Sequence, residues 1–74
     1  LTPGIPDVYC AISRGGFHGL FIEFKAGKNK LTEAQKIMFG KFSSAGYRCE
    51  VCYSFEDAVK IFADYVEGKC YECK

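Results

Sequence analysis

Three charged residues lie within or beside segments of this chain that otherwise have the composition of buried β-strands. Asp7 opens the apolar run 7–12, while Glu23 and Lys25 belong to the apolar run 20–26. Glu23 and Lys25 are two residues apart, so on a strand their side chains point to the same face. Burying a carboxylate or an ammonium group is costly unless it is paired, hydrogen-bonded or bound to a metal. The pattern therefore indicates a chemical role for these residues.

The chemistry that these residues predict is metal-assisted hydrolysis of a phosphate ester. If the two runs pair, Asp7 and Glu23 converge at one end of a sheet. Their carboxylates, with the backbone carbonyl of Phe24 and waters, form an oxygen-rich site suited to Mg²⁺ or Mn²⁺. Such an ion generates hydroxide from water and stabilises charge on a phosphate. Lys25 would stabilise the charge at the scissile phosphate, or orient or deprotonate the attacking water.

Local patterns predict an α/β fold with the element order strand, strand, helix, strand, helix. The glycine-rich segment 13–19 predicts a turn, so the runs 7–12 and 20–26 should form an antiparallel hairpin. Thr32 and Ser54 have the sequence context of helix N-caps, and Gly46 and Gly68 that of helix terminators. The strand at 47–53 follows the first helix, which predicts a parallel pairing with 20–26 and a mixed sheet with flanking helices.

The two helices each carry an apolar stripe that should face the sheet. The predicted stripe residues are Ala34, Ile37, Met38 and Phe42 in the first helix, and Ala58, Val59, Ile61, Phe62, Tyr65 and Val66 in the second.

Size and composition indicate one small folded domain over residues 1–74, with a tail at 69–74. The chain is 49% hydrophobic and 26% charged, which argues against intrinsic disorder. The net charge is +1, so any contact with nucleic acid must come from local clusters of basic residues. Its apolar runs are shorter than a membrane span, and we expect no membrane partner.

The five cysteines allow two interpretations. An odd number in a chain with a hydrophobic core favours reduced thiols and a cytoplasmic setting. The pairs Cys49-x2-Cys52 and Cys70-x2-Cys73 alternatively fit the spacing of a four-cysteine zinc site, and thus a zinc-stabilised interaction domain. A regular strand would point Cys49 and Cys52 to opposite faces, which disfavours zinc. We then expect Cys10 and Cys49 to be small buried residues, and a disulfide between Cys70 and Cys73 is a further alternative.

The spacing of these motifs resembles a known nuclease family. Pro6-Asp7 followed by Glu23-Phe24-Lys25 matches the signature of PD-(D/E)xK nucleases. The longer pattern resembles the virus-type replication-repair nuclease (VRR-NUC) domain over about residues 4–66. It comprises Gly4-Ile5-Pro6-Asp7, the string RGGFHGLFIEFK from Arg14 to Lys25, Leu31-Thr32-Glu33-Ala34-Gln35 and Ala45-Gly46-Tyr47.

This resemblance implies a restriction-endonuclease-like core and a metal-dependent endodeoxyribonuclease. Asp7 and Glu23 would bind the metal, Lys25 would be catalytic, and Gln35 would point from its helix toward the site. Stand-alone phage and bacterial members of the family are homodimers that act on branched DNA such as four-way (Holliday) junctions, in the bacterial or phage-infected cell. The family core also has a helix and a strand before the Gly-x-Pro-Asp motif, which this sequence does not include. A catalytically inactive, DNA-binding nuclease fold is therefore the alternative.

Each candidate residue also has a simpler interpretation. Asp7 could be a turn or cap residue, and Glu23 with Lys25 a surface pair on an edge strand. Gln35 could serve only the capping box of its helix. His18 and the basic residues Arg14, Lys28 and Lys30 could be solvated loop residues. If the site is real, we expect these four to flank it and to contact DNA phosphates.

Overall fold

The computed structural model describes residues 4–68 and contains the five elements that the sequence predicts. They are the strand β1 (Val8–Cys10), the strand β2 (Leu20–Phe24), the helix α1 (Glu33–Ser44), the strand β3 (Arg48–Cys52) and the helix α2 (Phe55–Val66). Each strand is shorter than the apolar run that predicts it. The predicted mixed α/β architecture is confirmed.

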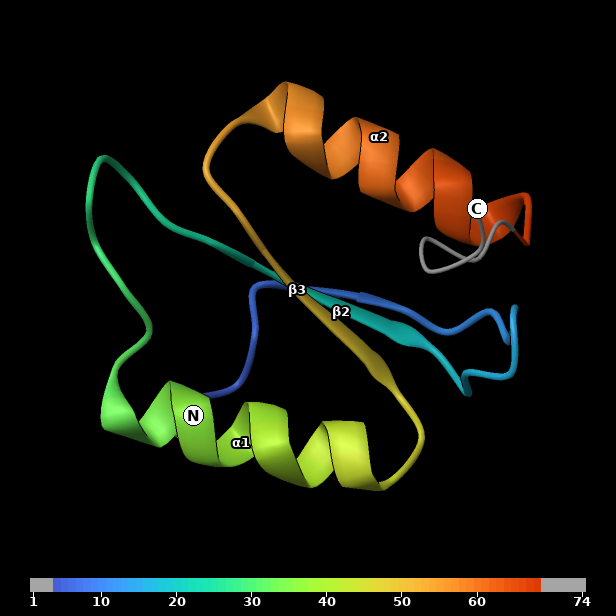
Figure 1. Cartoon of the computed structure of the whole chain (residues 1–74), viewed down its shortest axis with the longest axis horizontal. Helices are drawn as coiled ribbons and strands as arrows, with labels where there is room; N and C mark the ends of the chain where they lie inside the picture. The colour runs from blue at the N-terminus through green and yellow to red at the C-terminus, as the bar shows by residue number, and fades with distance from the viewer. Residues whose placement is uncertain (1–3, 69–74) are drawn as a thin grey trace.

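The sheet has the order β1-β2-β3, with β2 in the centre. β1 pairs antiparallel with β2, with Val8 opposite Ile22 and Cys10 opposite Leu20. β3 pairs parallel with β2, as the connection through α1 requires. Figure 1 shows α1 against one face of the sheet and α2 against the other. The central strand is therefore covered on both faces, and its first four residues are buried.

The hydrophobic core lies on the face that α2 covers. It consists of Cys10, Leu20, Ile22, Cys52, Ala58 and Tyr65, with Phe17, Ile61 and Val66 packed around them. The Tyr65 ring is 2% exposed, and its hydroxyl donates a hydrogen bond of 2.6 Å to the carbonyl oxygen of Ile12. This bond ties the end of α2 to the segment that follows β1.

The face that α1 covers is aromatic. The ring of Phe21 on β2 stacks between Tyr9 of β1 and Phe42 of α1, and Tyr47 packs against all three rings. Aromatic rings each bury a large apolar area, even in a thin layer between a helix and a sheet. This layer holds α1 to the sheet although none of the helix residues is fully buried.

The helix ends follow the predicted caps. Thr32 and Gln35 form a complete capping box at the start of α1, and the Ser54 side chain accepts a hydrogen bond from the backbone N–H of Asp57 at the start of α2. Gly46 follows the end of α1 with φ +97°, and a β-carbon there would lie 2.6 Å from the His18 ring. Glycine is thus required at this turn for both its conformation and its size.

The predicted apolar stripes are only partly correct. Ile37 of α1 is 57% exposed, and Val59 and Phe62 of α2 are also exposed. On the α2 side, an open groove of about 260 Å³ has entirely apolar walls formed by Val8, Ile22, Phe24, Phe55, Ala58, Val59 and Phe62. The helix thus covers β3 and β2 but leaves the β1 edge of this face open.

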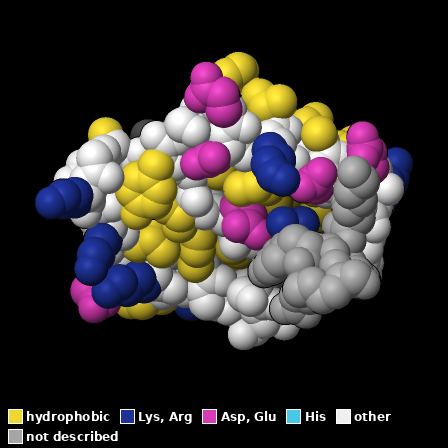
Figure 2. Space-filling model, turned by 45° about the horizontal axis from the view of Figure 1, so that its top comes forward, with side chains coloured by type: hydrophobic (Ala, Val, Ile, Leu, Met, Phe, Trp, Pro, Cys, Tyr) yellow, Lys and Arg dark blue, Asp and Glu magenta, His cyan; other side chains and the backbone are white. Residues whose placement is uncertain are grey.

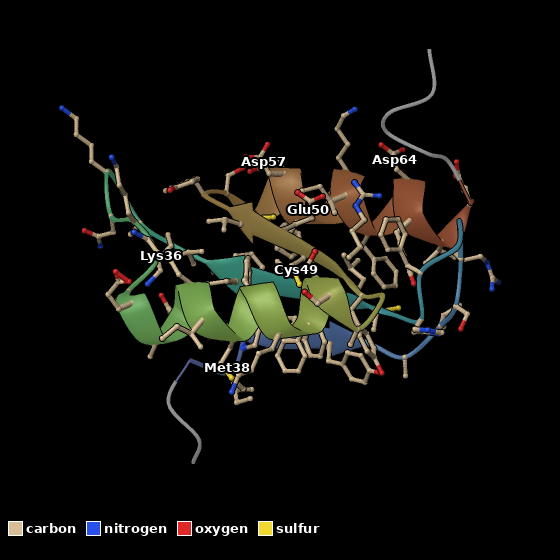
Figure 3. All side chains as sticks on the ribbon, turned by 60° about the horizontal axis from the view of Figure 1, so that its bottom comes forward. Lys36, Met38, Cys49, Glu50, Asp57 and Asp64 are labelled. Carbon is tan, nitrogen blue, oxygen red and sulfur yellow. The ribbon has the colours of Figure 1, made fainter. Side chains whose placement is uncertain are left out.

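The cysteines on β3 point to opposite sides, as a regular strand dictates. The Cys49 thiol contacts the Phe39 carbonyl oxygen of α1 at 3.8 Å, whereas Cys52 is fully buried in the core beside α2. In Figure 3, Cys49 lies over α1 and its neighbour Glu50 on the α2 side. Cys52 rather than Cys49 is therefore the deeply buried thiol, and the prediction for Cys49 was wrong in degree.

Within residues 4–68 there is no cluster of three or more His, Cys, Asp and Glu side chains arranged to hold a metal. Cys10, Cys49 and Cys52 are free thiols. Cys70 and Cys73 lie outside the described residues. Among the helices of the described part, none is long and apolar enough to cross a membrane.

We expect Tyr65→Phe to lower the free energy of unfolding by about 1 kcal/mol, because it leaves the Ile12 carbonyl without its buried donor. Urea denaturation measures this change. Tyr53→Phe is the matched control, since the Tyr53 hydroxyl also donates to a backbone carbonyl, that of Asn29, but from a half-exposed ring. Equal losses in the two variants would contradict the assignment of Tyr65 as the anchor of α2.

Candidate active site

The hairpin register brings Asp7 beside Glu23. Val8 is opposite Ile22, so continuing the antiparallel pairing by one residue places Asp7 opposite Glu23. The Asp7 Oδ2 atom accepts a hydrogen bond of 2.9 Å from the backbone N–H of Phe24. The Asp7 side chain thus binds the neighbouring strand at the end of β2 and lies beside the second predicted carboxylate.

Gln35 connects the first turn of α1 to the Glu23 carboxylate. Its Oε1 atom accepts from the backbone N–H of Thr32, and its Nε2 atom donates to Glu23 Oε2 at 2.9 Å. A side-chain amide can do both because it carries an acceptor and a donor. Gln35 therefore completes the capping box and also points from its helix toward Glu23, as the resemblance implied, while its role in catalysis stays a prediction.

Glu23 is a buried carboxylate that its surroundings only partly compensate. The residue is 5% exposed, and its Oε1 atom is buried without a hydrogen-bond partner. Burial, followed by the negative charge of Asp7, raises the pKa of Glu23, while the positive charge of Lys25 lowers it. The Lys25 Nζ atom lies 3.9 Å from Glu23 Oε2. Glu23 and Lys25 are therefore not an exposed surface pair.

These residues fit a hard divalent cation. A cation between Asp7 and Glu23 would satisfy the buried Oε1 atom and remove the repulsion between the carboxylates. Since the described residues hold no third acidic or histidine ligand nearby, backbone carbonyl oxygen and water would complete such a site. The predicted donor set of Asp7, Glu23 and the Phe24 carbonyl has this composition.

The loop after β2 carries two of the predicted DNA-binding residues, Lys28 and Lys30, at the same end of the sheet as Lys25. The loop is tied to β3 by two hydrogen bonds: Lys25 N–H to Cys52 O at 2.9 Å, and Tyr53 hydroxyl to Asn29 O at 2.9 Å. Figure 2 shows Lys and Arg side chains gathered at this end of the molecule. The role of Tyr53 had no signal in the sequence, because its partner is a backbone atom remote in the chain.

Arg14 and His18 lie at the other end of β2. The five residues of this strand span about 13 Å, and the 13–19 turn and the 25–32 loop lie at opposite ends of it (Figure 1). Arg14 Nε donates to Val66 O at 3.0 Å, and the backbone N–H of His18 donates to Gly46 O at 2.8 Å. The expectation that these two residues flank the carboxylates is therefore not met, and their contact with DNA stays a prediction for a more distant part of the surface.

Comparisons with known proteins give one consistent result. The family model for the VRR-NUC domain matches residues 1–56. A solved structure described as a VRR_NUC domain protein is similar to this chain with a TM-score of 0.84 and 31% sequence identity, over 90% of this chain and 56% of that chain. The chain thus spans little more than half the length of that protein. A search of curated proteins found no match.

Without metal, we expect the pH dependence of stability to report on Glu23. Because its folded pKa is raised above the ordinary 4.5, the folded state holds the proton more tightly. The resulting stability is present below pH 4.5 and is lost as the pH rises through the folded pKa. Glu23→Gln should remove this loss and raise the free energy of unfolding at pH 7 by about 1–3 kcal/mol.

Urea denaturation in EDTA at pH 4 and pH 7 measures this difference. Glu56→Gln, which removes an exposed carboxylate in the first turn of α2, is the matched control for the loss of one carboxylate. If Glu23→Gln destabilises the protein at pH 7, the carboxylate is fully compensated in the metal-free fold and the assignment fails.

Proposed function

This chain belongs to the VRR-NUC domain family of nucleases, and on this premise we propose that it hydrolyses phosphodiester bonds of DNA with Mg²⁺ or Mn²⁺. The observation that supports this proposal best is the buried, unpartnered Glu23 Oε1 atom beside Asp7. A purely structural pair of carboxylates at this position would destabilise the fold without return. With a divalent cation bound, the carboxylates of Asp7 and Glu23 would both serve as metal ligands.

The residues of the site would divide the work as follows. Asp7, Glu23 and the Phe24 carbonyl hold the ion, which when bound activates water and stabilises charge on the phosphate. Lys25 lies beside Glu23 and stabilises the negative charge that develops on the scissile phosphate, or orients the attacking water. Gln35 fixes the Glu23 carboxylate, and Thr32 fixes Gln35 through the capping box.

The DNA substrate that we propose is branched, such as a four-way junction, cut by a homodimer. Lys28 and Lys30 would contact phosphates beside the site, and Arg14 and His18 would contact a more distant part of the same DNA. Such contacts position the substrate without reading its sequence. Two sites related by a two-fold axis would match the paired strands of a junction.

A second candidate is a nuclease fold that binds DNA without cutting it. The match to the family supports a nuclease fold and does not by itself establish cleavage. Binding of a labelled junction in EDTA, with no cleavage on addition of Mg²⁺ or Mn²⁺, would support this candidate over the first.

We expect the protein to cleave a labelled four-way junction in Mg²⁺ or Mn²⁺ and not in EDTA. Lys25→Ala should reduce the rate by at least about a hundredfold, because it removes a charge at the reacting phosphate. Gel electrophoresis of the products measures both. Lys41→Ala, in the last turn of α1 away from the carboxylates, is the control. Equal cleavage by Lys25→Ala, or none by the unaltered protein, would overturn the proposal.

The double role of Gln35 gives a second comparison. Gln35→Ala and Thr32→Ala both break the capping box, which should lower stability by about 1 kcal/mol. Gln35→Ala should cost about 1–3 kcal/mol more, because the buried Glu23 carboxylate also loses its donor. Only Gln35→Ala removes the donor to Glu23, so it should reduce the cleavage rate by about tenfold or more relative to Thr32→Ala. Cleavage rates at a temperature where both variants are folded test this difference. Equal rates would show that Gln35 serves the helix alone.

A further inference from the structure

Tyr9 presents an aromatic ring at the free edge of β1. β1 is an edge strand of the described sheet, and Tyr9 is 50% exposed. One part of its ring stacks on Phe21 at a centroid distance of 4.6 Å, and Phe21 stacks on Phe42 at 4.2 Å. The three rings form a column that runs from the partly buried Phe42 through the buried Phe21 to the half-exposed Tyr9.

The position of this ring is fixed by its neighbours. A β-carbon on Gly19 would lie 2.9 Å from the Tyr9 Cε1 atom, so the absence of a side chain at residue 19 makes room for the ring. Tyr47 packs against it from a third side, with a centroid distance of 6.2 Å. A ring held in this way needs little further ordering when a flat partner stacks on it.

The column lies directly beside the carboxylates. Phe21 and Glu23 are two residues apart on β2, and both face α1, through Phe42 and Gln35 respectively. Tyr9 is opposite Phe21, as Asp7 is opposite Glu23 by the same register. Tyr9 and Asp7 are therefore successive positions on one face of one edge, about 7 Å apart. This is the scale of a single nucleotide.

We propose that Tyr9 is a substrate-positioning residue that stacks on the base of a nucleotide next to the scissile phosphate. Every base has a π-face, so such stacking is tolerant of sequence. In a continuous duplex the base faces are covered by their neighbours, and the ring therefore selects DNA in which this base has lost a stacking neighbour, as at a branch point or in a single strand. The inference rests on the proposed nuclease function for its position relative to the cut, whereas the stacking itself requires only DNA binding.

The test uses short single-stranded and forked DNA with the fluorescent base 2-aminopurine at successive positions, titrated with the protein in EDTA. We expect quenching at one or two positions. Tyr9→Leu should abolish this quenching and weaken binding by about five- to hundredfold, whereas Tyr9→Phe and Tyr9→Trp should retain both. Phe62→Leu is the matched control, since Phe62 is a 43% exposed aromatic residue of α2, on the opposite face of the sheet. Melting temperatures of all variants are measured alongside.

Cleavage assays with the same variants separate the two proposals. If the protein cuts, Tyr9→Leu should raise KM with little change in kcat, and the quenched base should adjoin the mapped cut. If quenching depends on Tyr9 but no cleavage occurs, stacking stands and the nuclease proposal fails. If Tyr9→Leu lowers only the melting temperature and leaves quenching and KM unchanged, or if no position is quenched, the inference is overturned.

Discussion

The burial of one carboxylate on the central strand is the constraint on which the rest of the structure depends. Glu23 is shielded from water because β2 has a strand on each side and a helix on each face. A charge in such a place must be compensated locally. The fold brings two such partners, Gln35 from the first turn of α1 and Lys25, which directly follows β2. Asp7, which directly precedes β1, instead adds a second negative charge beside Glu23. One carboxylate oxygen remains without a partner, and this gap is the feature that a bound cation would close.

The two faces of β2 have separate tasks. Leu20 and Ile22 point to the α2 side, where they join Tyr65 and Cys52 in a dry apolar core. The alternate residues Phe21 and Glu23 point to the α1 side, where aromatic stacking and polar compensation take the place of aliphatic packing. Side chains of a strand alternate between its two faces. A five-residue strand can therefore stabilise the domain through one face and hold the buried Glu23 carboxylate on the other.

The sequence predicts the elements and the proximity of Asp7, Glu23 and Gln35 well, because both depend on short-range patterns. Helix caps, the glycine-rich turn and the helical connection between β2 and β3 determine the topology, and the topology places Asp7, Glu23 and Gln35 together. Contacts to backbone atoms leave no such pattern: the bonds of Tyr65 to Ile12 and of Tyr53 to Asn29 were not predictable. Helical periodicity also predicts more burial than the structure shows. Val59 and Phe62 follow the apolar stripe of α2, but they line the open groove and are exposed.

The net charge of the chain does not describe the local charge around the candidate active site. The net charge is only +1, yet β2 and β3 both end near the starts of α1 and α2 (Figure 1). The N-terminus of a helix carries a partial positive charge, but acidic residues in the first turns, Glu33 in α1 and Glu56 and Asp57 in α2, offset it. In the proposed function, attraction for phosphates would therefore come from the lysines of the loop after β2. The Tyr53 hydroxyl ties that loop to the end of β3 through Asn29, so its lysines lie at the same end of the sheet as the carboxylates whose repulsion a cation would relieve.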